Sequence, residues 1–144
     1  MTASAFGQGI DEFNRQQFYA CHDTLEALWM ESAEPEKTFY QGILQIAVAC
    51  YHLENNNWRG AVILLGEGVR RLQHYQPDYE GINVTHLVGE SLDLLNFLQN
   101  LDPQALPAVL EAMKSNQEHP HPHLDLSVPC RKSSKFIPFS KQLD

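Results

Sequence analysis

Residues 36–54 constrain the fold of this chain most strongly, because a helix built from them would be apolar on nearly every side. Its apolar residues include Phe39, Ile43, Leu44, Ile46, Ala47, Val48, Cys50 and Tyr51. A helix without a polar face is stable in water only when other elements cover it all round. We therefore predict that the chain folds around this segment as its central helix.

Apolar residues at helical spacing also run through the flanking segments, and the alternation typical of strands is missing. Pro35 and the triplet Asn55–Asn57 mark turns at the two ends of the central helix. Predicted helices cover residues 8–15, 18–32, 36–54, 58–75, 84–100 and 102–114, and residues 77–83 are predicted as a loop. Asp102 is expected to cap the last helix, with Pro103 in its first turn. The predicted fold is all-α, a compact bundle of five to six antiparallel helices.

A weak internal similarity at an offset of about 40 residues suggests that these helices form hairpin pairs. The two sets, each spanning a polar turn between helices, are Phe13, Phe18, Cys21 and Leu25, and Leu53, Trp58, Ala61 and Leu65. This pattern is weakly similar to tetratricopeptide repeats, in which an aromatic and a small residue let paired helices approach. Two copies are too few for a repeat array, so the prediction is limited to paired antiparallel helices.

Charge and proline content divide the chain near residue 114. Residues 1–114 carry six basic and fifteen acidic residues, whereas residues 115–144 carry four basic residues, three acidic residues and four prolines. We predict a helical domain over residues 1–114 and an irregular C-terminal tail over residues 115–144. The net charge of -8 repels nucleic acids and anionic membrane surfaces, so neither is expected as a partner.

The cysteine pattern and the N-terminal sequence favour the cytoplasm. The three cysteines are odd in number and none forms a closely spaced pair, which argues against a disulfide framework or a cysteine zinc site. The first ten residues lack the pattern of a signal peptide, and no apolar run approaches the roughly 18 residues of a membrane span. We therefore expect a cytoplasmic protein that does not enter the membrane.

Two polar lines along neighbouring predicted helices could form a site. His22, Glu26 and Trp29 lie within about 60° of one another on a helix with 100° per residue. Gln41 and Gln45 form a similar line on the central helix, with His52 farther along it. If the two lines face each other, they enclose a polar pocket that must be satisfied internally or by a ligand. The predicted pocket contains His22, Glu26, Gln41 and Gln45, with Trp29 and Tyr51 as its walls.

The motif His22-x-x-x-Glu26-x-x-Trp29 resembles the hallmark of a prokaryotic family, the domain of unknown function 309 (DUF309). Phe13-Asn14, Gln41-Gly42, Gly60-Ala61 and the region of His52 are also similar to this family, and the resemblance covers about residues 6–100. The chain departs from it before Trp58, where the family often has Gly-Asn and this sequence has Asn56-Asn57. The resemblance implies an all-helical domain of unknown activity, with metal binding suggested for the His/Glu motif.

His22 and Glu26 supply only two ligands, whereas a zinc site needs three or four. His52 is a doubtful third ligand, because it lies about 10 Å along the helix axis from Gln45. Asp23 points about 100° away from His22 on the helix, which makes it a weak candidate, and a neighbouring subunit is another source. A manganese or magnesium site is the oxygen-rich alternative, although amide groups bind these ions weakly. The cofactor that the sequence suggests is a divalent metal ion.

Two hypotheses for function follow from these residues. In the first, the domain binds a metal ion or small ligand, with hydrolysis as the candidate reaction; without a metal, Glu26 would instead orient His22 as a general base. In the alternative, the protein is a non-enzymatic interaction or scaffold protein in which the His22–Glu26 pair fixes the register of the bundle. The alternative predicts self-association, or binding of a protein partner, through an exposed apolar face. The sequence indicates neither a substrate nor a nucleophile.

Overall fold

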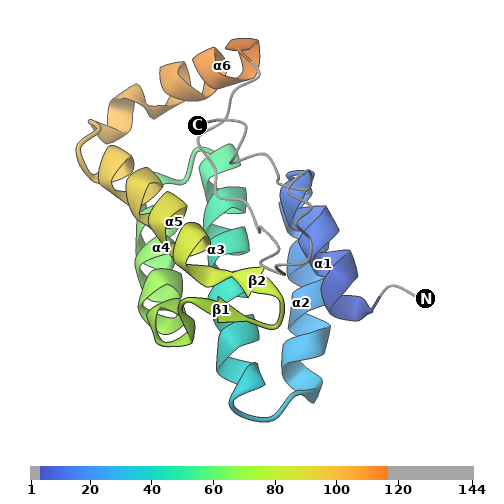
Figure 1. The fold of residues 1–144 in the computed structure, drawn as a ribbon. Helices are drawn as coiled ribbons and strands as arrows, with labels where there is room; N and C mark the ends of the chain where they lie inside the picture. Colours follow the sequence, from blue (N-terminus) through green and yellow to red (C-terminus); the bar gives the residue numbers. More distant parts are fainter. Residues whose placement is uncertain (1–3, 117–144) are drawn as a thin grey trace.

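Helix α3 (Glu36–Glu54) lies at the centre of the molecule, as its apolar sequence predicts (Figure 1). The structure is a computed structural model that describes residues 4–116. Helices α2 (Phe18–Glu31) and α4 (Trp58–Leu72) pack on α3. Burial of the aromatic and aliphatic side chains of α3 removes their apolar surface from water, which stabilises this arrangement.

The remaining helices complete an all-α bundle, which confirms the predicted fold class. Helix α1 (Ala5–Asn14) packs on α2, and α5 (Val84–Gln99) packs on α4. Helix α6 (Leu106–Asn116) lies at one end of the molecule, beyond the end of α5 (Figure 1). Two short 3-10 helices, η1 (Gln73–Tyr75) and η2 (Pro103–Ala105), join these elements. The order of helices agrees with the prediction from residues 8 to 114.

The turns from α1 to α2 and from α3 to α4 share one backbone feature, 40 residues apart. Gln16 has φ of 65° and Asn56 has φ of 60°, both in the left-handed region that ends many helices. Phe13 and Phe18 pack edge to face across the first turn, with ring centroids 5.5 Å apart. The internal similarity in the sequence therefore extends to the backbone of the two turns.

Helices α3 and α4 approach closely because two glycines lie in their contact. A Cβ atom added to Gly68 would lie 2.9 Å from the carbonyl oxygen of Gly42 and 2.7 Å from Cγ1 of Ile46. One added to Gly42 would lie 2.7 Å from Cγ of Leu72. These separations are shorter than van der Waals contact allows, so the spacing between the two helices depends on the missing side chains.

Residues 77–83 form a small hairpin, and the prediction of a loop was wrong there. Strands β1 (Asp78–Tyr79) and β2 (Ile82–Asn83) are antiparallel, with Tyr79 opposite Ile82. Glu80 and Gly81 join them with φ of 51° and 78°, and two successive positive φ values are typical of a tight hairpin turn. Strands of two residues are too short to show alternation, which explains why the pattern escaped the sequence prediction.

Helix α6 begins later than predicted, although the capping residue is the expected one. The Asp102 side chain accepts a hydrogen bond from the Gln104 backbone N–H at 3.0 Å, and this caps η2 instead of α6. Helix α6 starts at Leu106 and continues to Asn116, two residues past the predicted domain boundary. The rest of the predicted tail, residues 117–144, lies outside the described residues.

Candidate functional site

His22 lies on the side of α2 that faces away from the core. Phe18, Cys21 and Leu25 are buried on the inward side. Because these residues hold the rotation of α2, the residues between them point away from the core. The side chains of His22, Glu26 and Asp23 are 31%, 47% and 63% exposed. The polar residues of the motif therefore form a surface site and not an enclosed pocket.

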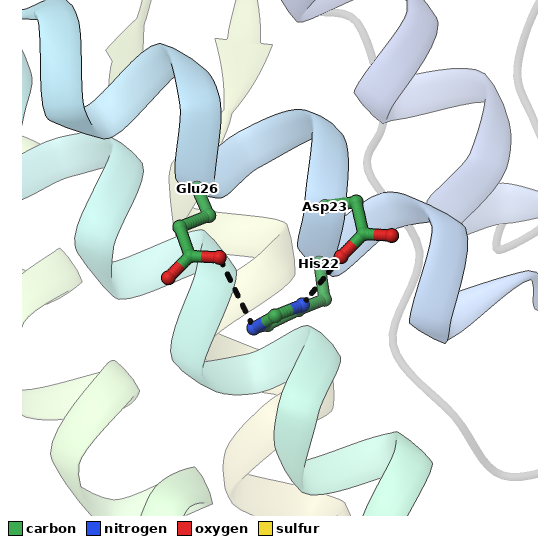
Figure 2. Close-up of side chains that lie close together, drawn as sticks. All are labelled: His22, Asp23 and Glu26. Atoms are coloured by element: carbon green, nitrogen blue, oxygen red, sulfur yellow. Dashed lines mark hydrogen bonds and ion pairs between the residues drawn. The ribbon is translucent and has the colours of Figure 1, made fainter.

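Both ring nitrogens of His22 face carboxylates from the same turn of α2 (Figure 2). Nδ1 lies 3.2 Å from Oδ1 of Asp23, and Nε2 lies 3.8 Å from Oε1 of Glu26. One ligand atom from each of the three residues lies within 4.8 Å of the other two. Among residues 4–116, this is the one group of three or more His, Cys, Asp and Glu side chains close enough to hold a metal ion.

The three side chains offer one nitrogen and two oxygen donors. Metal–ligand bonds of about 2.1 Å place ligand atoms roughly 3.4 Å apart in a tetrahedral site. An ion can bind only one nitrogen of the ring, so the carboxylate beside the other nitrogen has to rotate toward it. Exposed side chains on a helix surface can make such rotations. The two carboxylates would neutralise a divalent ion, whereas without an ion the protonated ring can donate to Asp23 at Nδ1.

Asp23 was the ligand that the helical angle disfavoured, yet the structure brings its carboxylate to His22. The angular argument treats each side chain as a direction from the helix axis, whereas neighbouring side chains can bend toward each other. In this case the short carboxylate reaches Nδ1 of the adjacent imidazole. The sequence feature that could have indicated this ligand was the acidic residue directly after His22.

The two glutamines lie apart from this group. Gln45 accepts a hydrogen bond from Nη1 of Arg71 at 3.1 Å, and the same nitrogen donates to Glu67 at 3.1 Å. Gln45 therefore serves the contact between α3 and α4. Gln41 is half-buried on α3. Within the described part of the chain, no hydrogen bond joins either glutamine to the His22 group.

The aromatic residues predicted as pocket walls lie at opposite ends of α2. The Lys37 ammonium is 4.5 Å from the ring centroid of Trp29 and donates to the Trp29 carbonyl at 2.9 Å. Trp29 packs against the core there, about two turns from His22. At the other end, Tyr51 contacts the ring of Tyr19, with centroids 5.3 Å apart.

His52 belongs to the turn between α3 and α4. Its Nδ1 lies 3.2 Å from the side-chain nitrogen of Asn57. Its ring also lies against Gly60, where an added Cβ atom would be 2.9 Å from Cδ2 of His52. His52 is not part of the group formed by His22, Asp23 and Glu26. Its described contacts are those of a residue that stabilises a turn.

The cysteine next to His22 is not positioned as a nucleophile. The Cys21 thiol is fully buried and donates to the Gly9 carbonyl at 3.4 Å. Burial, with a smaller contribution from Glu12, raises the pKa of Cys21 to about 12. Burial also raises the pKa of Cys50, and both thiols are free. Since the thiolate is the reactive form, neither residue is activated at neutral pH.

Comparison with known proteins agrees with the motif. The domain of unknown function DUF309 matches residues 6–64, which include the whole His22 group. These residues are therefore similar to the DUF309 family. The predicted resemblance is thus confirmed for residues 6–64, a shorter stretch than the expected residues 6–100.

Two curated proteins are similar to the chain over longer stretches. The uncharacterized protein YpuF of Bacillus subtilis is 32% identical over 97 residues, which are 66% of this chain and 55% of YpuF. An O-phosphoseryl-tRNA(Sec) selenium transferase of Caenorhabditis briggsae is 26% identical over 137 residues, which are 94% of this chain and 28% of that protein. The chain thus spans about half the length of one relative and little more than a quarter of the other.

None of the helices in residues 4–116 has both the length and the apolar character needed to cross a bilayer.

Proposed function

We propose that this chain binds a divalent metal ion through His22, Asp23 and Glu26. The observation that carries the proposal is that one ligand atom from each of these residues lies within 4.8 Å of the other two, on a single exposed turn of α2. Side chains held on a helix are positioned by its packing against the core, so the donors stay close to one another without a flexible loop.

The donor set favours a transition metal over calcium or magnesium. An imidazole nitrogen suits zinc, iron or nickel and the carboxylates suit manganese, whereas calcium and magnesium prefer oxygen ligands alone. Three protein ligands leave at least one coordination position open to water or to another ligand. An open position is what metal-assisted hydrolysis requires, so hydrolysis is the reaction we propose for the loaded site. The buried free thiols agree with a cytoplasmic location.

Metal binding can be tested with the purified full-length chain, made without a histidine tag. Residues His119, His121 and His123 are first replaced by Gln, because this short His-Pro tract could bind metal by itself. We expect one Zn²⁺ or Mn²⁺ per chain by calorimetry and elemental analysis. Binding should be lost in His22→Ala, and Asp23→Asn should weaken it by at least tenfold.

A matched control comes from α5, which carries a second histidine and glutamate at the same spacing. Nε2 of His86 lies 3.3 Å from Oε2 of Glu90. His86→Ala should leave the metal stoichiometry unchanged, since this pair is not part of a three-ligand group within the described residues. Wild-type protein that binds neither Zn²⁺, Mn²⁺ nor Ni²⁺, with an unchanged melting temperature, contradicts the proposal. So does equal loss of metal in His22→Ala and His86→Ala.

Self-association is the second candidate function, and large apolar side chains on the surface favour it. Ile63 of α4 and Phe97 of α5, two helices that pack on each other, are 52% and 43% exposed. Large exposed apolar residues are typical of surfaces that contact another protein when they form one patch. Sedimentation measurements should then show a dimer that Ile63→Glu or Phe97→Glu dissociates. A chain that stays monomeric at high concentration excludes this candidate.

A further inference from the structure

Tyr19 is a large aromatic residue that the fold leaves 58% exposed next to the proposed metal site. It lies three residues before His22 on α2, and its ring stacks on the imidazole with centroids 5.8 Å apart and an interplanar angle of 26°. Aromatic rings gain most when buried against another ring or an apolar surface. The exposed part of Tyr19 is therefore a surface on which a further ring could be buried.

A second ring, from another helix, supports Tyr19. Tyr51 of α3 is half-buried and tilts against Tyr19, with ring centroids 5.3 Å apart and an angle of 46°. The three rings of Tyr51, Tyr19 and His22 thus form an aromatic row that runs from α3 to the imidazole on α2. Because two helices contribute to it, the row is held by the packing of the bundle and not by a single mobile side chain.

The charges on α2 and α3 disfavour a phosphate ligand. The two carboxylates of Asp23 and Glu26 would neutralise a divalent ion. Helix α2 contains no lysine or arginine, and Lys37 is the single basic residue of this type on α3. Lys37 lies at the other end of α2, on Trp29. A multiply charged anion would therefore find no cationic partner on these two helices to hold it beside the metal.

We infer that the natural ligand of the site is a small aromatic molecule that chelates the metal ion through two neighbouring oxygen atoms. Its oxygens would occupy the open coordination positions, and its ring would lie against the exposed part of Tyr19. This inference rests on the proposed function, because the chelating group needs the metal ion. It adds a ligand class that the metal site alone does not specify.

Two hydroxamates test the inference, because they share the chelating group and differ in the ring. Zn²⁺-loaded protein is titrated with benzohydroxamate and with acetohydroxamate, and each affinity is corrected for binding of the same compound to free Zn²⁺. Aromatic pairs contribute modestly beyond apolar burial, so we expect benzohydroxamate to bind about two- to tenfold more tightly than acetohydroxamate. The preference should vanish in Tyr19→Leu and persist in Tyr19→Phe.

Control measurements separate this inference from the proposal on which it rests. Met30→Leu changes another exposed residue at the far end of α2 and should keep the preference. Direct Zn²⁺ titration should give the same affinity in wild type and Tyr19→Leu. If Zn²⁺ binds but both hydroxamates bind equally well, or if Tyr19→Leu keeps the preference, the inference is overturned and metal binding stands. If the wild-type protein binds neither Zn²⁺, Mn²⁺ nor Ni²⁺, the inference and the proposal of metal binding both fail.

Discussion

The contact between α3 and α4 and the outward turn of α2 use polar residues in opposite ways. In the contact, Arg71 donates to Gln45 on the facing helix and to Glu67 on its own, and Gly42 and Gly68 bring the backbones together. On the outward turn, the carboxylates that face His22 both come from α2 itself. The polar groups of the contact join two helices. Those of the outward turn, which are His22, Asp23 and Glu26, pair with one another within α2.

This difference locates the candidate site. A polar side chain that joins two helices contributes to the register of the bundle, and its atoms have little freedom to bind anything else. A polar group paired only within its own exposed turn can exchange that pairing for a metal ion at small cost, because exposed ion pairs contribute little to stability. The polar residues on the outward turn of α2 can therefore bind a ligand without loss of a contact that stabilises the fold.

The largest expected effect compares a core residue of the contact with the central residue of the site. Leu72 is fully buried and packs against Gly42. Leu72→Ala should lower the free energy of unfolding by about 2 to 5 kcal/mol, because it leaves a cavity. His22→Ala should change it by no more than about 0.5 kcal/mol in the presence of a chelator. Urea denaturation at 25 °C measures both, and similar losses would show that the two regions do not differ in this way.

A pair of glycines on α4 gives a sharper and smaller contrast. Gly68→Ala should lower the free energy of unfolding by about 1 to 3 kcal/mol, since its Cβ meets the backbone oxygen of Gly42 and no side-chain rotation relieves this. Gly66→Ala, two residues earlier, finds nothing within 4 Å of its Cβ and should raise stability by up to about 1 kcal/mol. The same urea measurements apply. Gly68→Ala at or above wild-type stability would contradict the close contact.

The smallest expected effect is a pH dependence at the edge of the contact. The hydrogen bond from Arg71, aided by the charge of Arg70, lowers the pKa of Glu67. The ionised carboxylate is thus favoured in the folded state, so its contribution is present above the ordinary pKa of Glu67 and is lost as the pH falls through the lowered value. Wild type should exceed Glu67→Gln in stability at pH 7, and the two should converge once the pH falls below the lowered pKa of Glu67. A difference that is constant with pH would exclude this contribution.

Features that depend on a few consecutive residues were predictable from the sequence. The all-round apolar pattern gave the position of α3, and the asparagine triplet indicated the turn in which Asn56 adopts positive φ. The spacing of His22 and Glu26 also selected the turn of α2 that carries the candidate site. Each of these features arises from contacts within about four residues, which periodicity and capping rules describe.

Features that depend on contacts between distant residues were not predictable in the same way. The line of glutamines on α3 was expected to face α2, whereas Gln45 meets Arg71, which lies 26 residues farther along the chain. The helical angle made Asp23 a weak candidate ligand. This angle contains no information about side-chain rotation, which brings the Asp23 carboxylate to His22. The sequence did not identify Tyr19 as a site residue, because its contact with Tyr51 joins two different helices.

The sequence by itself determined that this chain forms helices around α3 and that one turn of α2 carries an imidazole and a carboxylate on the same face. The tertiary structure decided which way each polar line points. Apolar spacing defines the inward side of an amphipathic helix, but α3 is apolar nearly all round, so its rotation depends on its neighbours. The close approach of α4 at Gly42 and Gly68 sets that rotation and directs Gln45 to Arg71.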